Sequence, residues 1–255
     1  LYVRLTTHLL RLDCRKFITS VFYSLIAKIL LFLSMVLPVK IILFLNPSQQ
    51  VPGFILELLG SKTNLVLALC GVMLASMVLA TAFKKKSNVL EGEKTDNLLS
   101  LLTEKPDKKV ISSTKSLVAK CVLSSALMIF SFICMIGALI LYPILLAVSI
   151  MSFTSYIMFA NFSIKRKRSR LHNTHKANNA SEELLSKLGG FTFIASFLYI
   201  VFDATINNAE HGFLTLVISL LLVRQYSSMS GKTADSLVKI NNSKNYATKI
   251  LEKKN

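Results

Sequence analysis

The sequence predicts an all-α, polytopic membrane protein built as a bundle of about six transmembrane helices. Hydrophobic residues make up 53% of the 255 residues, whereas an ordinary soluble domain is about 45–50% apolar. Charged residues account for 17% and are collected into a few blocks, which leaves long stretches almost uncharged. Because a membrane helix needs about 20 largely apolar residues to cross the hydrocarbon, such stretches are typical of multi-pass membrane proteins.

The apolar stretches divide the chain into a transmembrane domain, residues 1–240, and a polar cytoplasmic tail, residues 241–255. The stretch over residues 117–162 is long enough for two crossings, and Tyr142-Pro143 breaks it because proline removes a helix donor. The first stretch is far longer than a signal-peptide core, so we expect a retained anchor. The last two stretches are short, which leaves five or four crossings as alternatives. The expected spans are residues 17–45, 65–83, 117–140, 143–164, 190–206 and 211–231.

The placement of lysine and arginine orients these spans. With the N-terminus inside the cell, four cytoplasmic segments hold 26 of the 30 basic residues, and the external loops hold only Lys62. This asymmetry follows the positive-inside rule and places both termini in the cytoplasm. The net charge of +17 does not indicate nucleic-acid binding, because the basic residues flank apolar spans. We expect the partner to be the lipid bilayer of a plasma membrane, of the bacterial inner-membrane type.

The sequence shows no catalytic or metal-binding pattern. The four cysteines form no CxxC pair, and His172 and His175 lack a third ligand, so we expect no metal site. Gly231-Lys232-Thr233 is similar to the end of a phosphate-binding loop, but Tyr226 stands where that loop needs a glycine. We therefore expect that the chain is not an enzyme and binds no cofactor by itself.

Lys28 is the ionisable residue nearest the middle of an expected span, and a charge inside the membrane is a functional candidate. It lies 11 residues after Phe17, about 16 Å along a helix. If it faces the bundle interior, its ammonium would attract the carboxylate or phosphate of an anionic substrate. The alternative, which we favour, is that the helix starts below the bilayer and Lys28 extends toward the inner surface.

Leu98, Leu99 and Leu102 recur at helical spacing in an otherwise polar cytoplasmic loop. Such an apolar stripe suits packing into the groove of a partner protein. A short helix lying on the membrane surface would show the same pattern, so both interpretations stay open.

Several segments together resemble a known family. They are Leu37-Pro38-Val39-Lys40-Ile41-Ile42 at the end of the first span, residues 95–103 (TDNLLSLLT) followed by Asp107, residues 176–186 (KANNASEELLS), and residues 223–226, 233–240 and 246–252. This arrangement resembles the transmembrane domain of an ATP-binding-cassette (ABC) exporter of the six-helix type. In that family the corresponding segments are the end of the first helix, two cytoplasmic coupling segments and the exit into the ATPase domain.

The resemblance implies a membrane-spanning subunit of an ATP-driven exporter, working by alternating access as a homo- or heterodimer. Only a polar tail follows Ile240, so we expect ATP and Mg²⁺ to be bound by separate ABC ATPase chains. The chain departs from the family at Asp96 and Leu101, where the family has glycine and arginine, and in cytoplasmic extensions that look short. The residues expected to couple to the ATPase are Leu98, Leu99, Leu102, Glu182 and Glu183.

Two other functions fit the same pattern. One is a non-transporting assembly or regulatory membrane subunit related to ABC transmembrane domains. The other is an unrelated permease driven by an ion gradient, although such proteins usually carry several ionisable groups or broken helices near the midplane. An ATPase recovered with the purified protein would distinguish the ABC exporter from the ion-driven permease.

Overall fold

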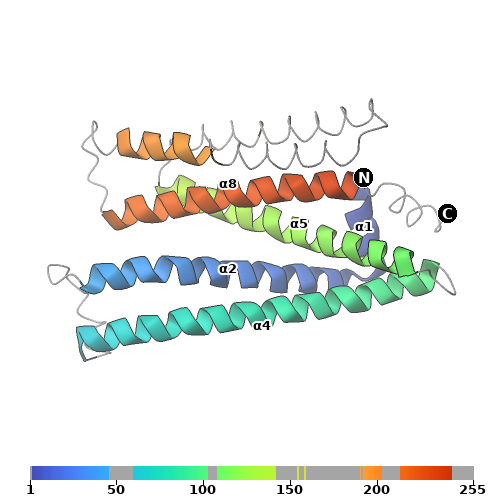
Figure 1. Ribbon diagram of the computed structural model, residues 1–255, viewed down its shortest axis with the longest axis horizontal. Helices are drawn as coiled ribbons and strands as arrows, with labels where there is room; N and C mark the ends of the chain where they lie inside the picture. Colours follow the sequence, from blue (N-terminus) through green and yellow to red (C-terminus); the bar gives the residue numbers. More distant parts are fainter. Residues whose placement is uncertain are drawn as a thin grey trace.

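The computed structural model describes residues 2–45, 60–102, 108–141, 192–202 and 213–242, together with the single positions 154, 158 and 190. This part of the chain contains six helices and is all-α, as predicted (Figure 1). The helices are α1 (Tyr2–Leu12), α2 (Cys14–Leu45), α4 (Lys62–Leu102), α5 (Lys108–Leu141), a short apolar helix (Thr192–Phe202) and α8 (Phe213–Asn242).

Three of the described helices, α2, α4 and α5, are long and apolar enough to cross a membrane. They cover the predicted spans 17–45, 65–83 and 117–140, which supports a multi-pass membrane protein. The short helix and α8 overlap the predicted spans 190–206 and 211–231. Most of the predicted span 143–164 lies outside the described residues, so the total of six crossings stays a prediction.

The distribution of polar side chains suits a bilayer better than water. Large apolar residues of α4 point outward, with Leu67 64% and Val78 67% exposed. Small hydroxyl residues are instead buried inside the bundle, and two pairs of them, Ser20 with Ser87 and Ser131 with Ser230, bond across helices. These buried residues include Ser20, Ser76, Ser87, Thr114, Ser124, Ser131, Ser219, Ser227 and Ser230.

The long helices pack mainly as two pairs, α2 with α4 and α5 with α8, and smaller contacts join the pairs (Figure 1). The start of α2, the end of α4, the start of α5 and the C-terminal end of α8 lie together at one end of the bundle, where α1 lies crosswise. We call this the basic end, because it carries the basic residues expected in the cytoplasm, among them Arg4, Lys94 and Lys239. The arrangement agrees with spans that alternate in direction.

Helix α4 is much longer than its predicted span. Its 41 residues extend about 61 Å at 1.5 Å per residue, about twice the hydrocarbon thickness. It continues for 19 residues beyond Phe83, and α5 begins nine residues before Leu117. The expectation of short cytoplasmic extensions is therefore wrong for the α4–α5 connection, because residues expected in a loop are helical. The second extension lies outside the described residues.

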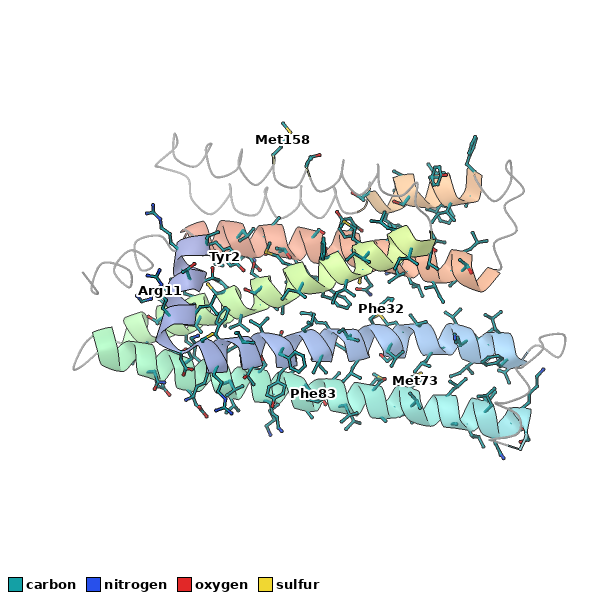
Figure 2. All side chains as sticks on the ribbon, turned by 180° about the vertical axis from the view of Figure 1, so that it is seen from behind. Tyr2, Arg11, Phe32, Met73, Phe83 and Met158 are labelled. Carbon is teal, nitrogen blue, oxygen red and sulfur yellow. The ribbon has the colours of Figure 1, made fainter. Side chains whose placement is uncertain are left out.

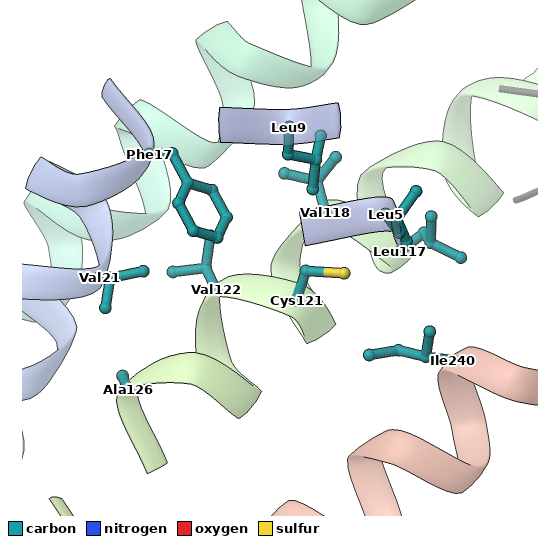
Figure 3. Packing of buried hydrophobic residues seen from close by; sticks show 10 residues of the cluster. All are labelled: Leu5, Leu9, Phe17, Val21, Leu117, Val118, Cys121, Val122, Ala126 and Ile240. Atoms are coloured by element: carbon teal, nitrogen blue, oxygen red, sulfur yellow. The ribbon is translucent and has the colours of Figure 1, made fainter. Parts of the chain in front are cut away.

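Helix α1 was not expected from the sequence and is held on the bundle by an apolar cluster (Figure 3). Leu5 and Leu9, one helical turn apart, are buried against α5. At the start of α1, the Tyr2 hydroxyl lies 2.7 Å from Ser125 Oγ of α5. Burial raises the pKa of Tyr2, and the hydrogen bond to Ser125 acts in the opposite direction. The full cluster is Leu5, Leu9, Phe17, Val21, Leu117, Val118, Cys121, Val122, Ala126 and Ile240.

Helices α5 and α8 approach each other through small residues. The hydroxyl oxygens of Ser131 and Ser230 lie 2.7 Å apart, and Ser131 also donates to the carbonyl oxygen of Tyr226 at 3.4 Å. Farther along α5, a side-chain carbon added at Gly137 would lie 3.3 Å from Leu222 Cδ1 of α8. The pair is therefore closely packed along its length, as membrane helices with small interfacial residues are.

Candidate functional site at the basic end

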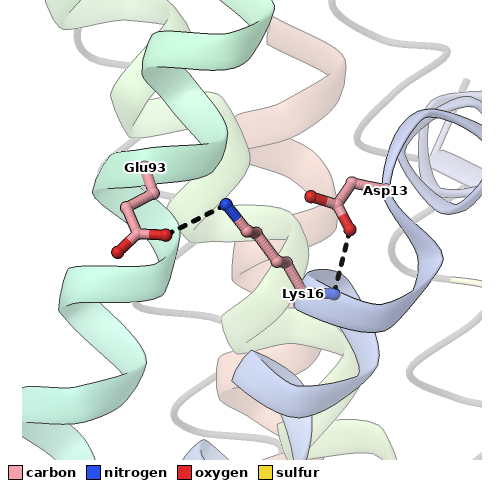
Figure 4. Close-up of polar contacts among 3 residues, drawn as sticks. All are labelled: Asp13, Lys16 and Glu93. Carbon is pink, nitrogen blue, oxygen red and sulfur yellow. Dashed lines mark hydrogen bonds and ion pairs between the residues drawn. The ribbon is translucent and has the colours of Figure 1, made fainter.

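Asp13 forms the corner between α1 and α2 (Figure 4). Its carboxylate Oδ1 accepts a hydrogen bond from the Lys16 backbone N–H at 3.1 Å, which is the usual role of an aspartate at a helix N-terminus. The Lys16 ammonium in turn lies 3.0 Å from Glu93 Oε2 of α4. The corner is thus capped by its own side chain and tied to the extension of α4.

Lys94 of α4 fills the angle between α1 and α2. It is only 2% exposed, and its ammonium donates to the carbonyl oxygens of Leu9 at 3.0 Å and Asp13 at 3.3 Å. The same ammonium lies 4.3 Å from the centre of the Phe17 ring, within cation–π range. A cation at the C-terminal end of α1 also interacts favourably with the helix dipole. Lys94 therefore fixes α1 to the part of α4 that is expected to couple to a partner.

The contact between α2 and α4 places Lys28 along the bundle. The side chains of Ser20 and Ser87 lie 3.1 Å apart, and the two helices run in opposite directions. Eight residues farther along α2, Lys28 is level with position 79 of α4, about 8 Å from the level of Lys84. Lys84 begins the basic run that ends the apolar segment of α4. Lys28 thus lies midway between the centre of this apolar segment, at position 74, and the basic run.

The face of α2 that carries Lys28 points toward α5 and α8. Leu25 and Phe32 pack against a buried cluster of Phe130, Cys134 and Tyr226. Lys28 lies three residues after Leu25 and four before Phe32, which places it on the same side of the helix. Figure 2 shows Phe32 between α2 and the α5–α8 pair, where its ring meets Phe130 edge-on at 6.2 Å.

The structure places the candidate coupling residues only in part. Leu98, Leu99 and Leu102 belong to the last two turns of α4, and their side chains lie outside the described part of the chain. A separate surface helix at these residues is ruled out, because they continue α4 without a break. Glu182 and Glu183 lie outside the described residues.

The structure also places the segment that is similar to the end of a phosphate-binding loop. Gly231-Lys232-Thr233 lies inside α8, where backbone N–H groups are used in helix bonds, so this segment is not a phosphate-binding loop.

Lys94 was not singled out from the sequence, because one lysine in a charged segment does not differ from its neighbours. The only available signal was the spacing of Leu5 and Leu9, which predicts that the N-terminal segment packs on the bundle.

Comparison with known protein families, curated proteins and solved structures finds no match for this chain.

Proposed function

We propose that the chain is the membrane-spanning subunit of an ATP-driven exporter of the ABC type, which forms the translocation path as a homo- or heterodimer and couples to separate ATPase chains. The observation that carries the proposal is the extension of α4 and α5 beyond their apolar segments. From Phe83 to Leu102, α4 projects about 28 Å, close to the thickness of the hydrocarbon itself. Together with the nine residues of α5 before Leu117, about 14 Å, this extension offers a cytoplasmic partner a surface that is continuous with two membrane helices.

The packing also favours the motion that such coupling needs. Contacts within the α2–α4 and α5–α8 pairs are more extensive than contacts between the pairs. Sliding or rotation of one pair against the other therefore disturbs the least packing, as in the shear and rigid-body motions of other proteins. Because α4 belongs to one pair and α5 to the other, a partner that binds both helices at the basic end would act on both pairs.

Affinity purification of the full-length chain from its native membranes in mild detergent tests the proposal. We expect a separate ATPase chain in near-stoichiometric amount and ATP hydrolysis by the purified complex. Recovery of other membrane proteins without an ATPase would contradict transport and favour the assembly or regulatory subunit. Recovery of the chain alone, with solute uptake driven by an ion gradient, would favour the permease.

A further inference from the structure

A second contact between helices shows which residue of α8 lies level with Lys28. Gln225 Nε2 of α8 donates a hydrogen bond to Met35 Sδ of α2 at 3.3 Å. The two helices run in opposite directions, so seven residues back along α2 and seven forward along α8 bring Lys28 and Lys232 to the same level. Lys232 belongs to the Gly231-Lys232-Thr233 segment of α8, and its side chain is exposed.

Lys84 approaches the same point from α4. A long side chain on a helix leans toward the helix N-terminus, so the Lys28 ammonium extends from the level of position 79 toward that of Lys84. Three lysines from three helices therefore lie within about 8 Å of one level along the bundle, where the α2–α4 pair meets α8.

The charges of this cluster are not balanced by the described part of the chain. The ion pairs found there between separate side chains are Lys16–Glu93 and Lys239–Asp235, and neither involves the three lysines. Lys28 is half-buried, while Lys84 and Lys232 are exposed. Like charges brought together at the edge of an apolar bundle repel one another in a medium of reduced dielectric. An anion bound between them would remove that repulsion.

We propose that Lys28, Lys84 and Lys232 form a binding site for a phosphate-bearing anion. Phosphate fits because its several oxygens can accept hydrogen bonds from more than one ammonium group, and lysine binds it as a point charge. The group is supplied either by the headgroup of an anionic lipid or by a free phosphate compound. That the bound anion is also the exported substrate rests on the proposed transport function. The binding itself needs no ATPase, so the two proposals can fail separately.

Binding to the full-length chain in neutral detergent tests the site with two probes. The first is dioctanoyl phosphatidylglycerol, with dioctanoyl phosphatidylcholine as the zwitterionic comparison, and the second is inorganic phosphate. We expect Lys28→Met to weaken binding of the anionic probe by about tenfold, since it removes a partly desolvated charge partner. The exposed Lys232→Met and Lys84→Met should weaken it by a smaller factor, and Lys28→Arg should retain most of it.

Lys40→Met is the matched control, because it removes a half-buried lysine from the outer half of the same helix. Loss of phosphatidylglycerol binding in Lys28→Met, with no binding of inorganic phosphate, assigns the site to a lipid headgroup. Loss of inorganic phosphate binding in the same variant assigns it to a free anion. If Lys28→Met and Lys232→Met bind both probes as tightly as Lys40→Met does, or if the wild type binds neither, the proposal is overturned. Because Lys232 is exposed, its variant keeps this comparison valid even if Lys28→Met does not fold.

Discussion

The ammonium group of Lys94 lies 3.0 Å from the carbonyl oxygen of Leu9, across 85 residues of sequence. This oxygen also accepts a hydrogen bond from the backbone N–H of Asp13 at 3.3 Å, so it lies at the very end of α1. The extension of α4 and the crosswise helix α1 are thus joined by a buried, charged hydrogen bond. Any displacement of the α4 extension acts directly on α1.

Replacing Lys94 with methionine should release α1 from the bundle. The change keeps the length of the side chain but leaves the carbonyl groups of Leu9 and Asp13 without their charged donor, at a cost of about 1–3 kcal/mol. Limited trypsin digestion measures the result, since Arg4 and Arg11 are exposed on α1 and become cleavable when α1 frays. We expect faster cleavage at both sites in Lys94→Met.

Lys16→Met is the control for that experiment. It removes the ion pair with Glu93, whose side chains are 38% and 51% exposed, so its effect should stay below about 1 kcal/mol. Equal cleavage of α1 in the two variants would show that Lys94 does not hold α1.

The membrane-crossing helices could be predicted because length and lack of charge are sufficient to specify them. α2, α4 and α5 all cover the stretches expected from hydropathy. α1 was missed because the search was for about 20 uncharged residues, whereas the 11 residues of α1 include Arg4 and Arg11. Its apolar face, with Leu5 and Leu9, packs on α5, and a helix this short owes most of its stability to such tertiary packing.

The α4 extension was missed for a different reason. Its Lys, Glu and Leu residues form helix well, but their charges suggested a solvated loop. Pro106 is a better indicator of the end, since proline disfavours helix in the residue before it, and α4 ends at Leu102. The cluster of Lys28, Lys84 and Lys232 could not be predicted at all. It depends on the registers of α2 against α4 and α8, which are set by contacts such as Gln225 with Met35.

Cysteine labelling tests the predicted topology. In a background without the four native cysteines, a membrane-impermeant maleimide added outside should label cysteines introduced at Gln49 and Asn208 but not at Ser169 or Lys244. The expectation follows from the basic residues that keep the last two segments inside. Permeabilised membranes provide the control, because all four positions should then react. External labelling at Ser169 would overturn the orientation.

The tip of α4 should be needed for binding the partner ATPase. Glutamate at Leu98, Leu99 or Leu102 places a charge in the stripe expected to pack into a partner groove. We expect these variants to insert into the membrane normally but to lose most of the co-purified ATPase. Val89→Glu is the control, because Val89 is 56% exposed on the same extension and lies farther from the tip. Undiminished ATPase recovery in all three leucine variants would refute a docking role for this stripe.

Enlarging Gly137 should loosen the packing of α5 against α8. A side-chain carbon added at this position would lie 3.3 Å from Leu222 Cδ1, so the larger side chain of Gly137→Leu displaces Leu222 and loosens the α5–α8 packing, at a cost of about 1–3 kcal/mol. The buried thiol of Cys134, one turn away on α5, reports the change in a variant that keeps only this cysteine. We expect it to react faster with N-ethylmaleimide in Gly137→Leu. Gly71→Leu is the matched control, because nothing lies within 4 Å of a side-chain carbon added there. Equal Cys134 reactivity in the two variants would show that close packing at Gly137 does not hold this pair together.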